Sequence, residues 1–274
     1  MIRDITIGQY YPADSRIHRL DPRAKIVCTL LFLVSLFIQN SLLGYVIATL
    51  FLGTVIRLSK VPLKYIVKGL KPIVILLLFT VVMNLFLTQS GEVLAHFWIF
   101  TITEGGLRTS VFMAIRLMYL VAGSSIMTFT TSPNGLTDGM EKLLHPLNKL
   151  NVPVHEVAMM MSIALRFIPI LLEEADKIMK AQQARGADFE SGNIIQRAKA
   201  MVPILVPLFV SAFRRANDLA MAMESRCYHG GDGRTKMKPL RYKSRDRIAY
   251  VLTLIYIVLV FVVGRYVPFK LWIF

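Results

Sequence analysis

The sequence predicts an all-α, polytopic membrane protein with five transmembrane helices and a cytoplasmic domain that contains two long helices. Three observations support this prediction. Hydrophobic residues make up 55% of the 274 residues, and the mean hydropathy of +0.55 is well above that of an ordinary soluble domain. Long apolar runs occupy the first half of the chain and return near its end, and basic residues gather between them. A large soluble core is the weaker alternative.

Charge and cysteine content narrow the class further. A formal net charge of +15 is expected of a polytopic protein with basic cytoplasmic loops, so it does not by itself require a nucleic-acid partner. Cys28 and Cys227 are poorly placed to pair, and neither belongs to a metal-ligand spacing such as C-x-x-C. Because the first 23 residues are polar, we expect no cleavable signal peptide and an N-terminus that stays on the side of synthesis.

The first two spans are predicted to form a tight hairpin. Residues 24–56 are apolar apart from Lys25 and a polar break at 39–41, and this length suits two helices better than one. Each half has about 15 residues, or roughly 22 Å at the rise of an α-helix, so flanking residues must complete each crossing. Asp21 and Pro22 favour a helix start, because aspartate accepts hydrogen bonds from free N–H groups and proline has no N–H to leave unsatisfied.

Basic residues predict the orientation of the remaining spans. A run of five basic residues lies between positions 57 and 71, which places this run and the basic N-terminus on the cytoplasmic side. Residues 89–106 carry two glutamates and no Lys or Arg, so they are predicted to be external. The other spans are predicted at 73–88, 107–130 and 248–263, with the C-terminus outside. The predicted domains are therefore 1–130 with four spans, 131–247 in the cytoplasm, and 248–274 with the last span.

Two segments of the cytoplasmic domain have some of the character of spans. Residues 152–172 contain His155, Glu156 and Arg166, and one buried charge costs about 2.5 to 3.5 kcal/mol on insertion scales. Residues 201–213 are short for a span and contain two prolines. We expect both segments to lie flat or half-buried. The alternative of seven spans also leaves the C-terminus outside, so the charge rule alone does not exclude it.

A helical pattern with a proline near its start occurs twice between Val152 and Cys227. Each copy ends on an arginine between two small residues, as Ala184-Arg185-Gly186 and as Ser225-Arg226-Cys227. Superposing the arginines also superposes Ala175 on Ala216, Asp176 on Asn217, and Ala181 on Ala222. Considered alone, each arginine is interpreted as a cation that stabilises a helix C-terminus. Taken together, two guanidinium groups without bulky neighbours suit docking to a two-lobed partner.

The segments before each of the two arginine ends are rich in methionine and aliphatic side chains. Methionine adapts to several partners, which favours a docking surface; a core or lipid-facing role is nearly as strong a reading. The residues in question are Met159, Met160, Ile163, Leu165, Ile168 and Met201. Arg116 lies midway along the fourth predicted span and is a candidate functional residue. We favour an arginine that is satisfied inside the bundle, because no acidic residue is predicted at that depth.

Several classes lack the residues that they need. No G-x-x-x-x-G-K-[ST] loop is present, and Gly230-Gly231-Asp232-Gly233 is not followed by Lys and Ser or Thr, so ATP binding by that mechanism is excluded. Neither H-E-x-x-H, G-x-S-x-G nor paired intramembrane carboxylates occur, which argues against a protease, a hydrolase and a proton-coupled carrier. We expect no catalytic residue, metal site or cofactor. Any active transport would draw its energy from another chain.

Short segments along nearly the whole chain resemble one family, the transmembrane T subunits of energy-coupling factor (ECF) transporters, which are prokaryotic importers built on paired ABC ATPases. The similar segments are Gly8-Gln9-Tyr10, residues 18–25, Thr130-Thr131-Ser132-Pro133, residues 152–156, Arg166-Phe167-Ile168-Pro169 and residues 181–186. The last two are the most specific. The second arginine end departs from the more usual Ala-Arg-Gly at both neighbours.

The resemblance implies two long, crossed coupling helices on the cytoplasmic side of a prokaryotic cell membrane. It implies that Ala184, Arg185 and Gly186 contact one ATPase, and that Ser225, Arg226 and Cys227 contact the other. It also implies a separate substrate-binding S subunit, possibly interchangeable, against the methionine-rich surface, for uptake of a vitamin or other micronutrient. A stand-alone channel or carrier is the alternative. A membrane-anchored nucleic-acid binder is disfavoured, because acidic residues interrupt the basic cytoplasmic block.

Overall fold

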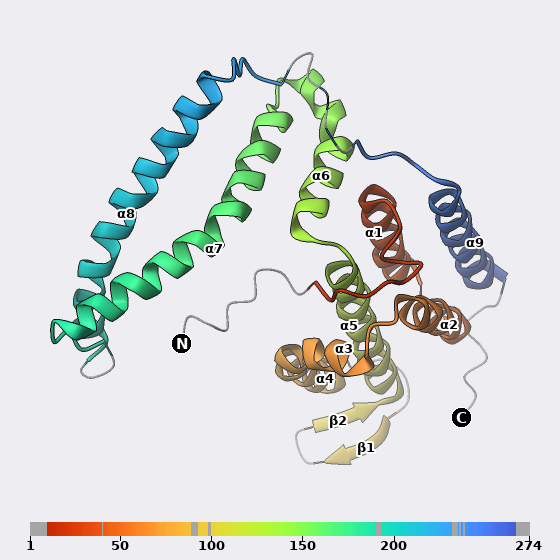
Figure 1. Cartoon of the computed structure of the whole chain (residues 1–274). Helices are drawn as coiled ribbons and strands as arrows, with labels where there is room; N and C mark the ends of the chain where they lie inside the picture. The colour runs from red at the N-terminus through yellow and green to blue at the C-terminus, as the bar shows by residue number, and fades with distance from the viewer. Residues whose placement is uncertain are drawn as a thin grey trace. The chain divides into compact units, whose positions relative to one another are not determined.

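The computed structural model describes residues 10–39, 41–88, 93–97, 100–189, 193–231, 235, 237 and 239–266 (Figure 1). These residues form two compact units. The bundle unit contains the described residues of Gly8–Gly139 and Leu240–Phe274, and the pair unit contains those of Met140–Pro239. The strongly helical fold predicted from the sequence is confirmed.

The predicted hairpin of the first two helices is present in the bundle unit. Helix α1 spans Pro22–Ile38, and the side chain of Asp21 caps it by accepting a hydrogen bond of 2.9 Å from the backbone N–H of Arg23. Helix α2 spans Leu42–Ser59, and Ser41 caps it in the same way through the N–H of Gly44. The polar break thus ends one helix and starts the next.

The rest of the bundle unit differs in detail from the predicted spans. Helical structure begins before residue 73, with α3 at Leu63–Leu70 and the 3-10 helix η2 at Lys71–Ile73 leading into α4 at Val74–Leu87. The loop predicted at 89–106 contains an antiparallel hairpin of β1, Val93–Phe97, and β2, Phe100–Thr103. Helices α5, Glu104–Thr130, and α9, Ser244–Tyr266, correspond to the fourth and last predicted spans.

Five helical segments in the described residues are long and apolar enough to cross a membrane. Their number agrees with the five predicted spans, but they are not the same five segments. The segments are Leu42–Ser59, Leu63–Leu87, Glu104–Thr130, Val154–Ala184 and Ser244–Tyr266. Helix α1, predicted as the first span, has 17 residues and is not in this set. Helix α7 satisfies the length and hydropathy of a span, although its charged residues argued against a crossing.

The core of the bundle unit joins α1, α2, α5 and α9. The ring of Phe51 stacks on Phe32 and on Tyr256, with 4.4 Å between the ring centroids of Phe51 and Tyr256. The hydroxyls of Ser35 and Tyr256 share a hydrogen bond of 2.9 Å, which satisfies both groups inside the apolar contact between α1 and α9.

A buried polar cluster fixes the start of α9 to the start of α1. Asp246 is 2% exposed and accepts hydrogen bonds from the backbone N–H groups of Asp21 and Lys243, at 2.8 and 2.7 Å. Lys25 donates to the backbone carbonyls of Thr130 and His18, so the same cluster also holds the end of α5. Burial alone would raise the pKa of Asp21, but the hydrogen bonds from Arg23 outweigh it and lower that pKa.

Arg116 is satisfied inside the bundle, as we expected. Its guanidinium donates to the hydroxyl of Tyr45 at 3.2 Å and to the backbone carbonyl of Gln39 at 3.1 Å. Gln39 is the C-cap residue of α1. Carbonyl groups at the C-terminal end of a helix have no partner within the helix. Arg116 therefore ties α5 to the hairpin of α1 and α2, and its role is accounted for structurally.

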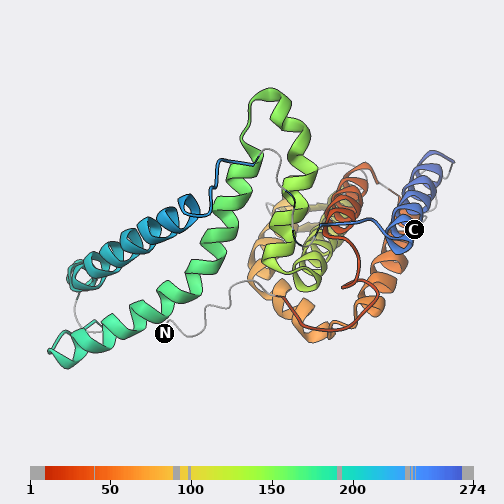
Figure 2. The ribbon, with the colours of Figure 1, turned by 45° about the horizontal axis from the view of Figure 1, so that its top comes forward.

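The pair unit contains two of the longest helices of the chain. The pair unit begins within helix α6, Pro133–Leu144, which is followed by the 3-10 helix η3, His145–Leu150. Helices α7, Val154–Ala184, and α8, Ile194–Glu224, have 31 residues each and pack against one another, as both ribbon views show (Figures 1 and 2). Helix α8 begins well before Pro203, so this proline lies inside the helix.

Candidate functional site

The first predicted site closes the C-terminal end of α7. Three backbone hydrogen bonds end the helix: Arg185 N–H to Gln182 at 3.1 Å, Gly186 N–H to Gln183 at 2.9 Å, and Ala187 N–H to Gln182 at 3.0 Å. Gly186 has a φ of +89°, in the left-handed region that favours glycine. This is a Schellman termination, in which the chain reverses sharply after the helix. Arg185 is exposed at the turn.

The second predicted site closes α8 with the same hydrogen bonds. Arg226 N–H donates to Met223 at 3.1 Å, Cys227 N–H to Glu224 at 2.8 Å, and Tyr228 N–H to Met223 at 3.0 Å. Each bond corresponds to the bond 41 residues earlier in α7. Cys227 takes the left-handed position with a φ of +54°, where α7 has glycine. The repeat inferred from the sequence is therefore matched by the backbone, and Arg226 is exposed like Arg185.

The two arginines lie at opposite ends of the pair of helices. Helices α7 and α8 are joined by a short connection and pack against each other, so they run antiparallel. After α8 the chain returns to the start of α7, where a side chain placed on Gly231 would meet the ring of His155. The start and end of α7 are separated by up to roughly 46 Å, from the rise per residue of an α-helix. The pair unit thus carries two similar arginine-containing helix ends that lie far apart.

A polar contact joins the two helices between these ends. Glu174 of α7 and Arg215 of α8 form an ion pair of 3.0 Å between Oε2 and Nη2. Both side chains are partly exposed, at 24% and 40%. Ala175, next in the chain, is buried, so the backbones come close here. The sequence did not reveal this pair, although it placed Glu174 among acidic residues in a basic block.

The predicted partner surface is only partly exposed within the pair unit. Met160, Ile168 and Met201 are exposed, whereas Met159, Ile163 and Leu165 are half-buried. The structure adds a row of exposed apolar side chains on α8 that sequence reasoning missed. Their spacing of three and four residues is the signal that was available. They are Val202, Leu205, Val206, Phe209, Val210 and Phe213.

The described residues hold no group of three or more His, Cys, Asp or Glu side chains that would suit a metal ion. Cys227 is exposed in the turn after α8, and Cys28 is partly buried in α1. The features that distinguish the pair unit are therefore its matched arginine ends and its exposed apolar surface. Both are suited to contacts with other proteins or with a membrane.

Comparison with known proteins covers most of the chain. A family model described as cobalt transport protein, CbiQ, matches residues 13–237. A protein of Clostridium kluyveri is 59% identical over 256 residues, which are 93% of this chain and 95% of the relative. One of Thermosediminibacter oceani is 56% identical over 252 residues, 92% and 95% of the two chains. One of Bacillus subtilis is 48% identical over 261 residues, 95% and 98% of the two chains.

Each of these three relatives is named energy-coupling factor transporter transmembrane protein EcfT. The family model spans both arginine ends and much of the bundle unit, and the identities extend over nearly the full length of the relatives. The resemblance found in short segments of the sequence is thereby confirmed. The chain belongs to the cobalt transport protein family, among the EcfT transmembrane components of energy-coupling factor transporters.

Proposed function

We propose that this chain is the non-enzymatic coupling scaffold of an ECF importer, linking two cytoplasmic ATPases to a substrate-binding S subunit. The observation that carries the proposal is the pair of matched arginine ends at opposite ends of two antiparallel helices. Two equivalent docking points suit two similar partner subunits better than one. The names of the relatives support the setting, since each is a transmembrane protein of an ECF transporter.

Arg185 docks on one ATPase and Arg226 on the other, each with its small neighbours Ala184 and Gly186 or Ser225 and Cys227. Their planar guanidinium groups form forked hydrogen bonds inside a groove of the partner. Closure of the ATPases on ATP draws the two ends together and tilts α7 against α8. Hydrolysis takes place on the partner chains, and this chain supplies the mechanical connection.

The exposed apolar side chains of α7 and α8 hold the S subunit, which reorients as the helices tilt. Met160, Ile168 and Met201 belong to this surface, together with the row on α8 from Val202 to Phe213. The flexible side chains of Met160 and Met201 adapt to different partners, so one scaffold serves interchangeable S subunits. The imported compound is a vitamin or another micronutrient.

In the topology that we propose, the N-terminus and the pair unit lie on the cytoplasmic side of a prokaryotic cell membrane, and the C-terminus lies outside. The run of basic residues between positions 57 and 71 supports this orientation. Helices α7 and α8 lie flat or half-buried at the membrane surface. The charged residues of α7 and the prolines inside α8 support this placement.

The test is co-purification from cells that also produce the ATPases and an S subunit. Replacing both arginines, Arg185→Glu and Arg226→Glu, should abolish ATPase co-purification in mild detergent while membrane insertion and S-subunit binding persist. The matched control is Lys177→Glu with Arg214→Glu, which makes the same charge change at exposed positions in the body of α7 and α8. Undiminished ATPase binding by the double arginine variant would refute the proposal.

A stand-alone channel or carrier is the competing function. Transport by the purified chain in vesicles without any ATPase would support it. The one arginine predicted deep in a span, Arg116, is used in contacts with Tyr45 and Gln39, which speaks against its being a substrate ligand.

A further inference from the structure

A cavity of about 600 Å³ lies in the bundle unit between α5 and the segment from α3 to α4. Its polar wall consists of three lysines, Lys64, Lys68 and Lys71. Its other walls are apolar and include Val74 and Leu77 of α4 and Met118 of α5. The cavity therefore has cations at one side and an apolar lining on the rest.

The three lysines carry charges that none of the described residues neutralises by an ion pair. They recur at intervals of four and three residues, so they share one face of a helical segment. None of them has a hydrogen bond or ion pair with another described residue. No aspartate or glutamate occurs anywhere between Pro22 and Gly91. The three lysines are therefore available to bind an anion from outside the chain.

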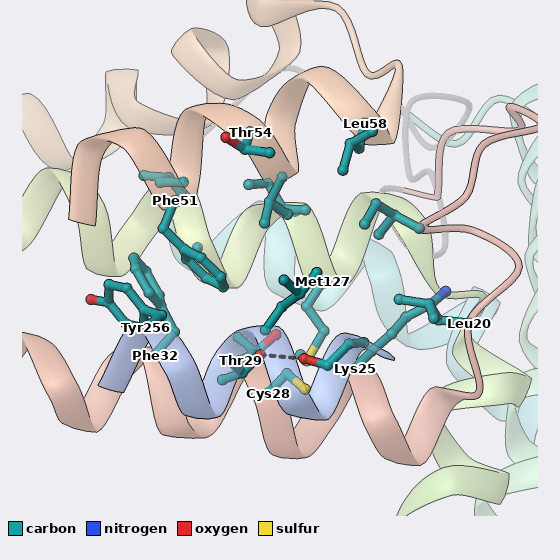
Figure 3. A pocket seen from close by; sticks show the side chains of 18 of the residues that line it. Leu20, Lys25, Cys28, Thr29, Phe32, Phe51, Thr54, Leu58, Met127 and Tyr256 are labelled. Carbon is teal, nitrogen blue, oxygen red and sulfur yellow. Dashed lines mark hydrogen bonds between the residues drawn. The ribbon is translucent and has the colours of Figure 1, made fainter. Parts of the chain in front are cut away.

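A second cavity of the bundle unit provides an internal comparison (Figure 3). It has a volume of about 510 Å³ and is lined mainly by apolar side chains of α1, α2, α5 and α9, with Lys25 as its cation. Lys25 is 7% exposed and already donates to the carbonyls of Thr130 and His18. Its charge thus serves the fold. The lysines of the cavity beside α3 are exposed and serve no such internal purpose.

The position of the cavity suits an amphiphile. Helix α3 is anchored by Ile66, which is 4% exposed in the core, and α4 follows with 14 residues that include no charge. The lysines therefore stand where a basic segment enters an apolar one. Basic pockets at such places bind the headgroups of acidic lipids, and each basic residue near an anionic surface strengthens binding by roughly fivefold.

We propose that this cavity binds one acidic phospholipid. Its phosphate lies among Lys64, Lys68 and Lys71, and an acyl chain lies along Val74, Leu77 and Met118. The acyl chain stays in apolar surroundings along this wall, so van der Waals packing holds the chain while the lysines select the charged headgroup. This site is independent of ATPase docking, and its failure would leave the coupling function untouched.

The experiment is native mass spectrometry of the full chain in mild detergent with phosphatidylglycerol or phosphatidylcholine of identical acyl chains. We expect one phosphatidylglycerol to be retained in preference to phosphatidylcholine. The variant Lys64→Gln, Lys68→Gln, Lys71→Gln should lose this preference, with affinity falling about a hundredfold for three lysines. The control Lys142→Gln, Lys149→Gln, Lys177→Gln removes the same charge at exposed positions outside the cavity and should keep it.

A second pair of variants tests the apolar walls at unchanged charge. Val74→Trp fills the cavity from a half-exposed position and should weaken retention, whereas Val82→Trp on the same helix should not. Three results would overturn the proposal. They are equal retention of the two lipids, equal losses in the two lysine variants, and displacement of the lipid by inorganic phosphate at the same concentration. Loss of the lipid when an S subunit binds would assign the cavity to a protein interface and would also overturn it.

Discussion

The ends of α7 and α8 share one backbone geometry but differ in sequence. Both helices close with the same three hydrogen bonds, and both place an arginine one residue before a left-handed position. In α7 that position is Gly186, which adopts it without strain. In α8 it is Cys227, whose side chain makes the conformation costly by about 1 to 2 kcal/mol.

This difference shows that the shape of the end is preserved even where the residue does not favour it. A helix that simply stopped after Glu224 would avoid the strained position at Cys227. The strain persists because the surrounding structure holds it, and such strain is concentrated at functional positions. The second end, which departs from the usual Ala-Arg-Gly, is therefore as good a candidate for docking as the first.

The largest effect is expected from replacing the two arginines one at a time. Arg185→Glu and Arg226→Glu, made singly, should each weaken ATPase retention by at least about tenfold, because arginines that become buried in an interface often dominate its binding energy. Quantitative co-purification at increasing salt measures the loss. If the two ends are equivalent, the two variants will behave alike. Wild-type retention by the Arg226 variant would show that only the α7 end docks.

Chemical labelling of Cys227 tests whether the C-terminal end of α8 lies in the ATPase interface. Its thiol is exposed, whereas Cys28 is partly buried, so a polar maleimide should label Cys227 faster by severalfold or more. Assembly with the ATPases should protect Cys227 and leave the Cys28 rate unchanged. A Cys28→Ser background isolates the signal. Labelling of Cys227 at the same rate in the assembled complex would place the α8 end outside the interface.

Exchanging the left-handed residues should move stability in opposite directions. Gly186→Ala has open space for its new methyl group, so its cost of about 1 to 2 kcal/mol is backbone strain alone. Cys227→Gly relieves the same strain, less the larger entropy that glycine loses on folding, for a net gain of about 0.5 to 1 kcal/mol. Thermal unfolding in detergent measures both. Destabilisation by Cys227→Gly would show that the cysteine side chain has packing contacts that outweigh its strain.

Much of the fold was accessible from the sequence because its signals are local. Asp21 and Pro22 start α1, the polar break ends it, and the repeat of two arginine ends is matched by the backbone. Arg116 was also interpreted correctly, since an arginine without an acid at its depth needs neutral acceptors, and it finds Tyr45 and Gln39. Each of these inferences rests on residues close in sequence or on a strong physical penalty.

Other features depend on contacts between distant segments. The hydrogen bond from the backbone N–H of Asp21 to the carboxylate of Asp246 joins positions 225 residues apart. The residues around Asp246 give no sequence signal that predicts it. The second helical pattern was described as having a proline near its start, but α8 begins nine residues before Pro203. In the structure it lies inside the helix, where its missing N–H is tolerated. The apolar segment 201–213 was recognised, but of its residues only Met201 was assigned to the partner surface, and the row from Val202 to Phe213 was not.

The smallest expected effect concerns the contact between the two ends. The ion pair of Glu174 with Arg215 is partly exposed, so its coupling should be only about 0.5 kcal/mol. A double-mutant cycle with Glu174→Gln and Arg215→Gln, read by thermal unfolding, isolates that value. The same cycle should change ATPase-driven transport more than stability if the pair holds α7 and α8 as one lever. Equal, small effects on both would show that the pair is a surface contact, and that the two arginine ends are joined by apolar packing alone.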